Sequence, residues 1–257
     1  MSSMPAAFIG HGSPMNTLEI NRYTSAWREF GATLARPRAI LCVSAHWFVN
    51  ATIVTAMESP RTIHDFYGFP QELFEVQYPA PGSPAVAQEV ADALAPLWCG
   101  LDTDSWGLDH GTWSVLAHLW PEADVPVVQL SIDTQKSIDE HIAIGRLLAP
   151  LRDEGVLILG SGNVVHNLSL IDWSDTDGGA TWAHVFDDAT REIMTSDPAQ
   201  LGSVLTLPEA RAAVPSPDHF LPLAYIAGIA DAADAPVRTL IDGYTYGSLS
   251  MTSYVVD

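Results

Sequence analysis

The sequence predicts an α/β fold in which one domain holds a central, largely parallel or mixed β-sheet flanked by helices. Two observations predict it. Short runs that are apolar on both faces recur along the chain, and stretches with helical periodicity lie between them. This alternation is typical of a sheet covered by helices on both sides. No stretch has the length and composition of a linker, so we expect a single domain over residues 1–257.

The expected elements follow one another along the chain. Apolar runs of strand length predict strands over 6–9, 39–43, 52–56, 125–130 and 156–159. Helical periodicity predicts helices over 23–35, 84–97, 113–120, 138–151, 181–195 and 222–232. The last stretch, 244–256, alternates and is rich in Tyr, Ser, Thr and Val, which favours a strand suited to a sheet edge.

Charge and composition narrow the kind of partner. The chain has 11 Lys and Arg against 31 Asp and Glu, a net charge of −20. Nucleic acids and anionic lipids need clustered cations, so we expect neither nucleic acid nor membrane as a partner, but a small molecule. The two cysteines form no CxxC pair. Without a signal-peptide pattern or a long apolar span, a cytoplasmic monomer or small homo-oligomer is expected.

The histidines carry the strongest functional signal. Three of the nine follow predicted strands: His11 in FIGHG, His46 in LCVSAHW and His166 in LILGSGNVVHNL. Ligands of open α/β sheets bind beyond the carboxyl ends of strands, and imidazole suits Zn and Fe. His110 in GLDHGTW and His219 in PSPDHFLPL lie in loops just before predicted helices. We therefore expect a metal site built from strand-end histidines.

The glycines around these histidines fit a sharp turn close to a bound group. Gly10 and Gly12 flank His11, and Gly160 and Gly162 precede His166. Neither stretch has the GxGxxG pattern or the lysine of a P-loop, so nucleotide binding is not indicated. The chain also lacks the GxSxG motif of serine hydrolases.

Seven motifs occur in the order found in a known family. They are GHGSPMN, SAHW, DFYGFP, YPAPGSP, LDHGTWSVL, PVVQLSID and GSGNVVHNL. From Phe8 to about His219 the chain resembles the class III extradiol ring-cleavage dioxygenases, in particular the 4,5-DOPA dioxygenase extradiol type. This branch is related to the beta subunit of protocatechuate 4,5-dioxygenase. The resemblance implies one α/β domain with a mononuclear non-haem Fe(II) site that is often found with Zn(II).

The resemblance also implies roles for the histidines. His11 and His46 match metal ligands. His166 matches the acid/base histidine, which in this branch lies close enough to the metal to count as a ligand. His219 matches a further metal-site histidine, and His110 matches a catalytic histidine that contacts substrate or O2. The glutamate ligand of the protocatechuate enzymes has no evident match, so His219, Asp218 or His166 is the candidate third ligand.

The implied activity is ring opening of a catechol, such as DOPA, with O2 to give a semialdehyde. His166 would accept a catechol proton. Four aromatic residues are candidate walls of the substrate pocket or core residues: Trp47, Phe66, Tyr67 and Phe69. Two alternatives remain on sequence grounds. One is a zinc-dependent hydrolase on the same histidines, and the other is a non-enzymatic binding protein like the Memo family.

Overall fold

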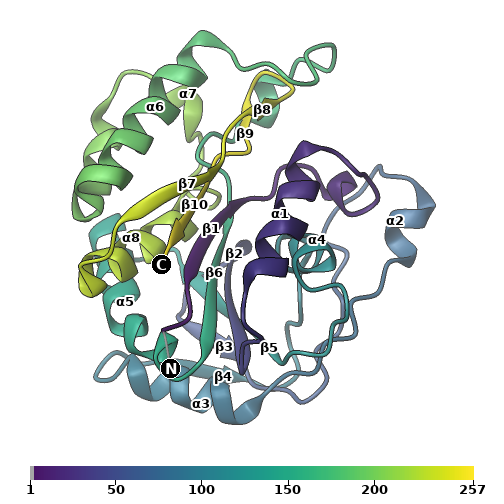
Figure 1. The fold of residues 1–257 in the computed structure, drawn as a ribbon, viewed down its shortest axis with the longest axis vertical. Coiled ribbons are helices and arrows are strands. Elements are labelled where there is room, and N and C mark those ends of the chain that lie inside the picture. Colours follow the sequence, from purple (N-terminus) through teal and green to yellow (C-terminus); the bar gives the residue numbers. More distant parts are fainter. Residues whose placement is uncertain (1–2) are drawn as a thin grey trace.

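A mixed β-sheet runs through the centre of the molecule, as the computed structural model of residues 3–257 shows (Figure 1). Eight strands of the described residues form it, in the order β4-β3-β5-β2-β6-β1-β10-β7. Their bounds along the chain are β1 Ala6–Gly10, β2 Ala39–Val49, β3 Ile53–Thr55, β4 Gly100–Asp102, β5 Val127–Asp133, β6 Val156–Gly162, β7 Val237–Ile241 and β10 Ser253–Val256. The predicted fold class is confirmed.

The helices lie on both faces of this sheet. They are α1 Arg22–Thr33, α2 Gln71–Glu75, α3 Pro84–Ala93, α4 His110–Leu119, α5 Ile138–Leu148, α6 Thr181–Ser196, α7 Ala210–Ala213 and α8 Leu221–Ala233. Short 3-10 helices are η1 Pro14–Thr17, η2 Ala149–Arg152, η3 Leu168–Leu170 and η4 Pro198–Thr206. Among residues 3–257 we find no helix with the length and apolar character needed to cross a bilayer.

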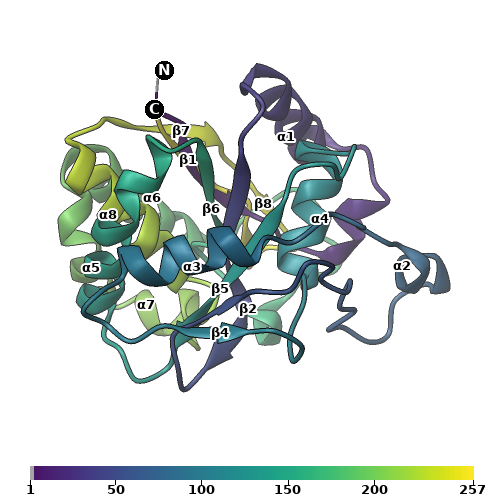
Figure 2. The same ribbon diagram turned by 90° about the horizontal axis from the view of Figure 1, so that it is seen from below.

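Alternation along the central strands divides the core into two layers. In β1, Ala6 and Phe8 pack with α5 and α8, whereas Ala7 and Ile9 pack with α1 and α4. Successive side chains of a strand point to opposite faces, so a strand that is apolar throughout serves both layers. Figures 1 and 2 show the consequence, with α1 and α4 on one side of the sheet and α5 and α8 on the other.

The central strands are parallel and the flanking pairs are not. β1 and β2 each run parallel to β6, and β2 runs parallel to β5. β10 pairs antiparallel with β1 and β7, and β3 pairs antiparallel with β5. Because β1, β6 and β2 are neighbours, Gly10 lies beside Gly162 and Ser44 lies beside Ser161. The chain therefore leaves three adjacent strands at the same end of the sheet.

The C-terminal stretch differs from the expected strand. Part of 244–256 forms a separate two-stranded sheet of β8 (Tyr244–Thr245) and β9 (Leu249–Ser250), and only β10 joins the main sheet. β10 is internal, because β7 covers its outer side. β7 has the sequence VRTLI with exposed or half-buried residues in its middle, as suits the edge that it occupies. The prediction of one continuous edge strand was wrong.

Candidate metal centre

A cavity of about 440 Å³ opens at this end of the sheet, and five histidines line it. His11 follows β1, His46 lies in the last part of β2, and His166 follows β6. His110 is the first residue of α4, and His219 precedes α8. The structure thus brings together all five histidines that the sequence singled out, from segments that are up to about two hundred residues apart.

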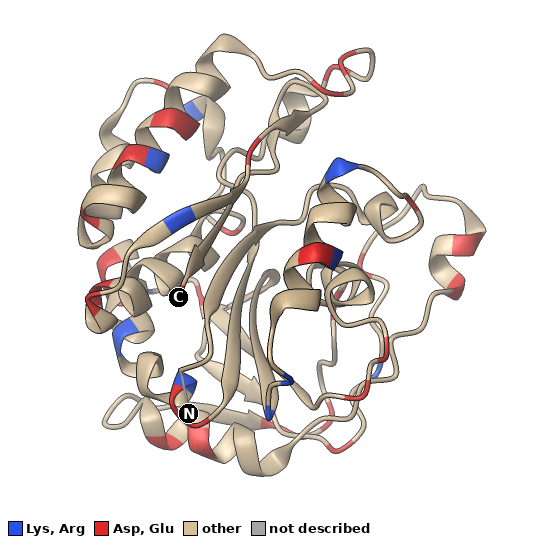
Figure 3. Ribbon diagram, in the orientation of Figure 1, with Lys and Arg blue, Asp and Glu red and all other residues tan. Residues whose placement is uncertain are grey.

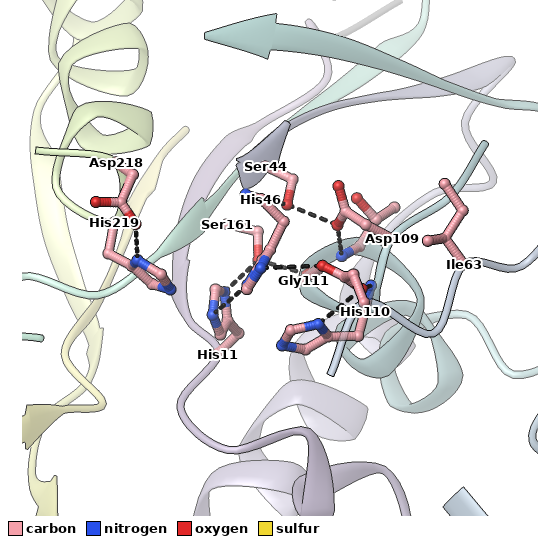
Figure 4. Close-up of polar contacts among 12 residues, drawn as sticks. His11, Ser44, His46, Ile63, Asp109, His110, Gly111, Ser161, Asp218 and His219 are labelled. Carbon is pink, nitrogen blue, oxygen red and sulfur yellow. Dashed lines mark hydrogen bonds and ion pairs between the residues drawn. The ribbon is translucent and has the colours of Figure 1, made fainter. Parts of the chain in front are cut away.

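Two of these imidazoles face each other at a separation that suits a shared metal ion. His11 Nε2 and His46 Nε2 lie 3.3 Å apart (Figure 4). Two nitrogens bound tetrahedrally to Zn²⁺ at 2.0–2.1 Å would be about 3.3 Å apart. His110 also offers a nitrogen, so that the ligand atoms of His11, His46 and His110 lie within 4.8 Å of one another. The donor set therefore fits a divalent metal.

The hydrogen bonds of His11 determine which of its nitrogens is free. Ser161 Oγ donates its single hydrogen to the Gly111 carbonyl at 2.5 Å, and the same oxygen lies 2.9 Å from His11 Nδ1 (Figure 4). The hydroxyl must therefore accept from Nδ1–H. Nε2 then carries the lone pair, and it points toward His46. A hydrogen-bonded second nitrogen of this kind is the usual arrangement for a metal-binding histidine.

Carboxylates orient three further imidazoles. Asp65 contacts both His46 Nδ1 (3.1 Å) and His110 Nδ1 (2.9 Å), and the backbone N–H of His110 also donates to it. Asp218 contacts His219 Nδ1 at 2.5 Å. Although burial opposes ionisation, these histidine contacts hold the pKa values of both carboxyls well below their usual range. Each of these histidines keeps its Nε2 free of the carboxylate.

Burial and mutual repulsion keep most of the cluster neutral. Burial lowers the pKa of His11 well below its usual value, and the neighbouring histidines lower it further. Burial likewise lowers the pKa of His219 to about 4 and that of His166 to about 2, with the His219 charge adding to the effect at His166. His46 is the exception, because Asp65 and other acids overcome burial and raise its pKa. Neutral imidazole is the form that binds metals.

His166 has a different contact from the others. Its ring stacks on the His219 ring, with centroids 3.5 Å apart and an interplanar angle of 3°. Its ring nitrogens have no hydrogen-bond partner among residues 3–257, in contrast to Nδ1 of the other four histidines. An imidazole on the cavity wall with unengaged ring nitrogens is free to exchange a proton with a bound molecule.

A buried acid fixes the loop that delivers His110. Asp109 caps α4 and is fully buried. It accepts from Ser44 Oγ at 2.7 Å (Figure 4) and from the Gln129 side-chain amide. Ser44 lies in β2 and Gln129 in β5, so these two bonds hold the N-terminus of α4 against the sheet. The motif DHG thus contains a positioning aspartate beside the cavity histidine.

The glycines near the cavity act differently from the expectation. A Cβ at Gly162 would overlap the carbonyl of His219, whose oxygen accepts from the Asn163 N–H at 2.9 Å. A Cβ at Gly10 would meet the backbone of Met251. Gly10 and Gly162 therefore admit other backbone segments, not a bound group, and the expected role was wrong for these two. The missing side chain at Gly162 is what lets His219 approach β6.

Replacing Gly162 should disturb the site through the backbone. In Gly162→Ala the new methyl displaces the His219 segment, so we expect weaker Co²⁺ or Zn²⁺ binding and a loss of roughly 1–3 kcal/mol in the free energy of unfolding. Metal competition and denaturant titration measure the two effects. Gly202→Ala is the control, because its Cβ would meet only side-chain atoms, Ile138 Cγ2 at 3.1 Å and Asp139 Oδ1 at 3.4 Å, and no backbone. Equal metal affinity in both variants would contradict this role of Gly162.

Apolar residues form the rest of the cavity wall. Three of the four predicted wall aromatics are there, namely Phe66, Tyr67 and Phe69, together with Leu168, Ile171 and Trp173. The fourth, Trp47, is buried and stacks on Trp106 with ring centroids 5.5 Å apart, so it is a core residue and not a wall residue. Aromatic and aliphatic walls around a few polar groups are typical of a small-molecule site.

Two participants were missed at the sequence level. Asp65 connects two cavity histidines, and Ser161 sets the proton position of a third. Asp65 lies in the DFYGFP motif and Ser161 in GSGN, so the motifs marked the right segments without indicating these contacts. Asp218, a candidate ligand on sequence grounds, bonds to His219 and does not line the cavity.

Comparisons with known proteins agree with this geometry. The family model for the catalytic LigB subunit of aromatic ring-opening dioxygenase matches residues 6–257. The chain is 49% identical to a 4,5-DOPA dioxygenase extradiol of Escherichia coli (strain K12), covering 97% of this chain and 93% of that one. It is 37% identical to a 4,5-DOPA dioxygenase extradiol of Beta vulgaris, covering 96% and 94%.

A solved structure shares the fold over its whole length. The crystal structure of an uncharacterized protein from Escherichia coli K12 superposes with a TM-score of 0.87 at 44% identity, covering 99% of this chain and 100% of that chain. A family match over almost the whole chain, together with relatives of this identity, confirms the resemblance found in the seven motifs. The chain belongs to the LigB family of aromatic ring-opening dioxygenases and is an extradiol ring-cleavage dioxygenase of class III.

Proposed function

We propose that this enzyme opens the ring of a catechol beside its two hydroxyls with O2, using Fe(II) held by His11, His46 and His219. The observation that carries the proposal is the convergence of five buried or half-buried histidines on one apolar-walled cavity in a chain of this family. Relatives named 4,5-DOPA dioxygenase extradiol support a DOPA-like catechol as substrate.

The spacing of the rings favours His219 as the third ligand. Imidazoles that radiate from one metal at 2.0–2.1 Å have ring centroids about 4.5–5.2 Å apart. The centroid distances are 5.1 Å for His11–His46, 5.1 Å for His46–His219 and 5.3 Å for His11–His219. His110 is 3.9 Å from His46 and 5.9 Å from His11, which fits this pattern less well. The distances between ligand atoms group His110 with His11 and His46, whereas the distances between ring centroids favour His219.

Carboxylates lie next to two of the three proposed histidine ligands. His46 and His219 donate to Asp65 and Asp218, and a carboxylate behind a ligand increases the basicity of the imidazole. These acids compensate part of the charge of a dication without being ligands. When bound, Fe(II) would hold the diol and provide the electronic path from the aromatic ring to O2, and Zn(II) would occupy the site without this redox chemistry.

The remaining two histidines then have roles in proton transfer. His166 lines the cavity and its ring nitrogens are unengaged, so we assign it as the acceptor of a proton from a catechol hydroxyl. His110 is tied through Nδ1 to Asp65, which leaves Nε2 to donate to or contact oxygen atoms in the cavity. Phe66 packs edge-on against His110 with centroids 5.4 Å apart and shields this face from water. The cavity is thus suited to bind an aromatic diol and to orient it beside the two histidines.

A stopped-flow experiment tests the proposed function. Anaerobic protein loaded with Fe(II) is mixed with L-DOPA and then with O2. We expect one O2 consumed per catechol and a yellow ring-opened semialdehyde, and we expect no uptake with the Zn(II)-loaded protein. Fe(II)-loaded protein that consumes no O2 with any catechol in a panel would contradict the proposal. Uptake of O2 by the Zn(II) form would instead contradict the assignment of the metal.

The cytoplasmic location and the monomeric or small homo-oligomeric state stay predictions.

A further inference from the structure

The cavity contains no cationic side chain for a substrate carboxylate. None of the eleven Lys and Arg residues, all of which fall within the described residues 3–257, lines it. Figure 3 shows these cations on outer helices, loops and strand ends. Arg22, at the start of α1, pairs with Asp177 at 2.9 Å and with the Tyr23 hydroxyl. With the metal occupied by the catechol diol, a side-chain carboxylate entering the cavity would therefore lose water without gaining a Lys or Arg counter-ion.

The helix that begins in the cavity offers no substitute. A free helix N-terminus attracts anions through its unpaired N–H groups. At α4, Asp65 already accepts from the His110 N–H at 2.9 Å, and Asp109 accepts from the Thr112 N–H at 3.2 Å. The protein's own acids thus occupy this anion-binding position. Asp65 also adds negative charge to the cavity wall.

The rim of the cavity has the opposite character, because it is aromatic and acidic. Trp173 is 72% exposed, and its ring lies 5.0 Å from that of Tyr246 at an angle of 55°. Both line the cavity. The N–H of Asp172 donates to the Tyr246 carbonyl at 3.0 Å, which fixes the Trp173 segment to Tyr246. Aromatic faces attract ammonium groups, and neighbouring negative charge increases the effect.

The acids at the rim are largely uncompensated. Asp172 and Asp175 lie on the loop before α6, next to Trp173, and within residues 3–257 neither has a Lys or Arg nitrogen within 4 Å. Only Asp177 on this loop is paired, with Arg22. The loop is marked by its acidic residues in Figure 3. A positive group at the rim would meet the aromatic side chains of Trp173 and Tyr246, with uncompensated carboxylates nearby on the same loop.

We propose that the rim formed by Trp173, Tyr246 and the acidic loop selects catechols whose side chain ends in a protonated amine and disfavours those that end only in a carboxylate. The proposal rests on the catechol-opening function and specifies its substrate class. For an amino-acid catechol, the ammonium contacts the rim and the carboxylate stays in solvent. A catecholamine without a carboxylate is then bound at least as well as the amino acid.

Four catechols of matched length test the rim with the Fe(II)-loaded enzyme. They are dopamine, L-DOPA, the neutral 4-ethylcatechol and 3-(3,4-dihydroxyphenyl)propionate. We expect kcat/KM for dopamine to exceed that for the propionate by about tenfold. Two effects contribute: the ammonium is attracted to the two aromatic rings, and the carboxylate is repelled by the acidic loop. High salt should reduce this ratio, because the rim is exposed. A ratio of one or less would overturn the proposal.

Binding measurements test the selectivity of the rim independently of the ring-opening reaction. Anaerobic calorimetry with the same four compounds gives the ranking of Kd values whether or not any ring is opened. Absence of O2 uptake with all four, including 4-ethylcatechol, would count against the proposed function alone. In that case a Kd for the propionate equal to or below that for dopamine would overturn the proposed selectivity, and the reverse order would support it.

Three variants locate the effect at the rim. Trp173→Leu should lower the ratio of kcat/KM for dopamine to kcat/KM for 4-ethylcatechol about two- to fivefold, since the π-face is lost but an apolar contact is kept. Trp98→Leu is the matched control, because Trp98 is 70% exposed and does not line the cavity. Leu168→Lys places a cation on the cavity wall and should shift the preference toward the propionate. An unchanged ratio in both Trp173→Leu and Leu168→Lys would overturn the role of the rim.

Discussion

His219→Ala should lose the metal, whereas His110→Ala should keep it. If His219 completes the set with His11 and His46, removing its imidazole leaves two neutral ligands, and we expect metal affinity to fall by roughly 100-fold or more with activity below detection. In His110→Ala the three rings at 5.1–5.3 Å remain. Its metal content should be normal, with kcat lowered by about 10²-fold.

Metal analysis after dialysis and Co²⁺ absorption spectra distinguish the two variants. Co²⁺ gives a ligand-field spectrum that depends on the number of nitrogen ligands, independently of turnover. His184→Ala serves as a control, because His184 is exposed on α6 and contacts Tyr244 outside the cavity. The opposite result, with metal lost in His110→Ala and kept in His219→Ala, would refute the ring-geometry assignment and favour the group of His11, His46 and His110.

His166→Ala should abolish turnover and spare catechol binding. The side chain is the proposed base beside the proposed ligands, and loss of a positioned base lowers rates by about 10²–10⁴-fold. The stacked contact with His219 is lost as well. We therefore include His166→Phe, which restores a ring over His219 but has no nitrogen to accept a proton.

The readouts are kcat, KM, metal content and anaerobic Kd for the catechol. A proton-transfer role requires low kcat in both variants, with metal content normal in His166→Phe and the Kd changed by less than about fivefold. If His166→Phe recovers most of the activity, His166 acts by packing on His219 and is not the base. Loss of metal in both variants would instead make His166 a ligand.

The sequence predicted the fold class and the five histidines that the structure brings to one cavity. Apolar runs on both faces predicted buried parallel strands, and β1, β2, β5 and β6 form where such runs occur. Histidines at strand ends were informative because parallel strands present their carboxyl ends together, so His11, His46 and His166 had to approach one another. The ordered motifs then identified the family, since several motifs in sequence are far more specific than one.

The tertiary structure decided the contacts within the site and the placement of the C-terminal strands. Spacing along the chain says nothing about which nitrogen of an imidazole is protonated, and only the bond from Ser161 to Gly111 determines this for His11. Likewise, β10 lies inside the sheet because β7, which local patterning did not reveal, covers its edge. Both depend on partners far away in sequence. Local patterns determine what an element is, whereas packing determines what it contacts.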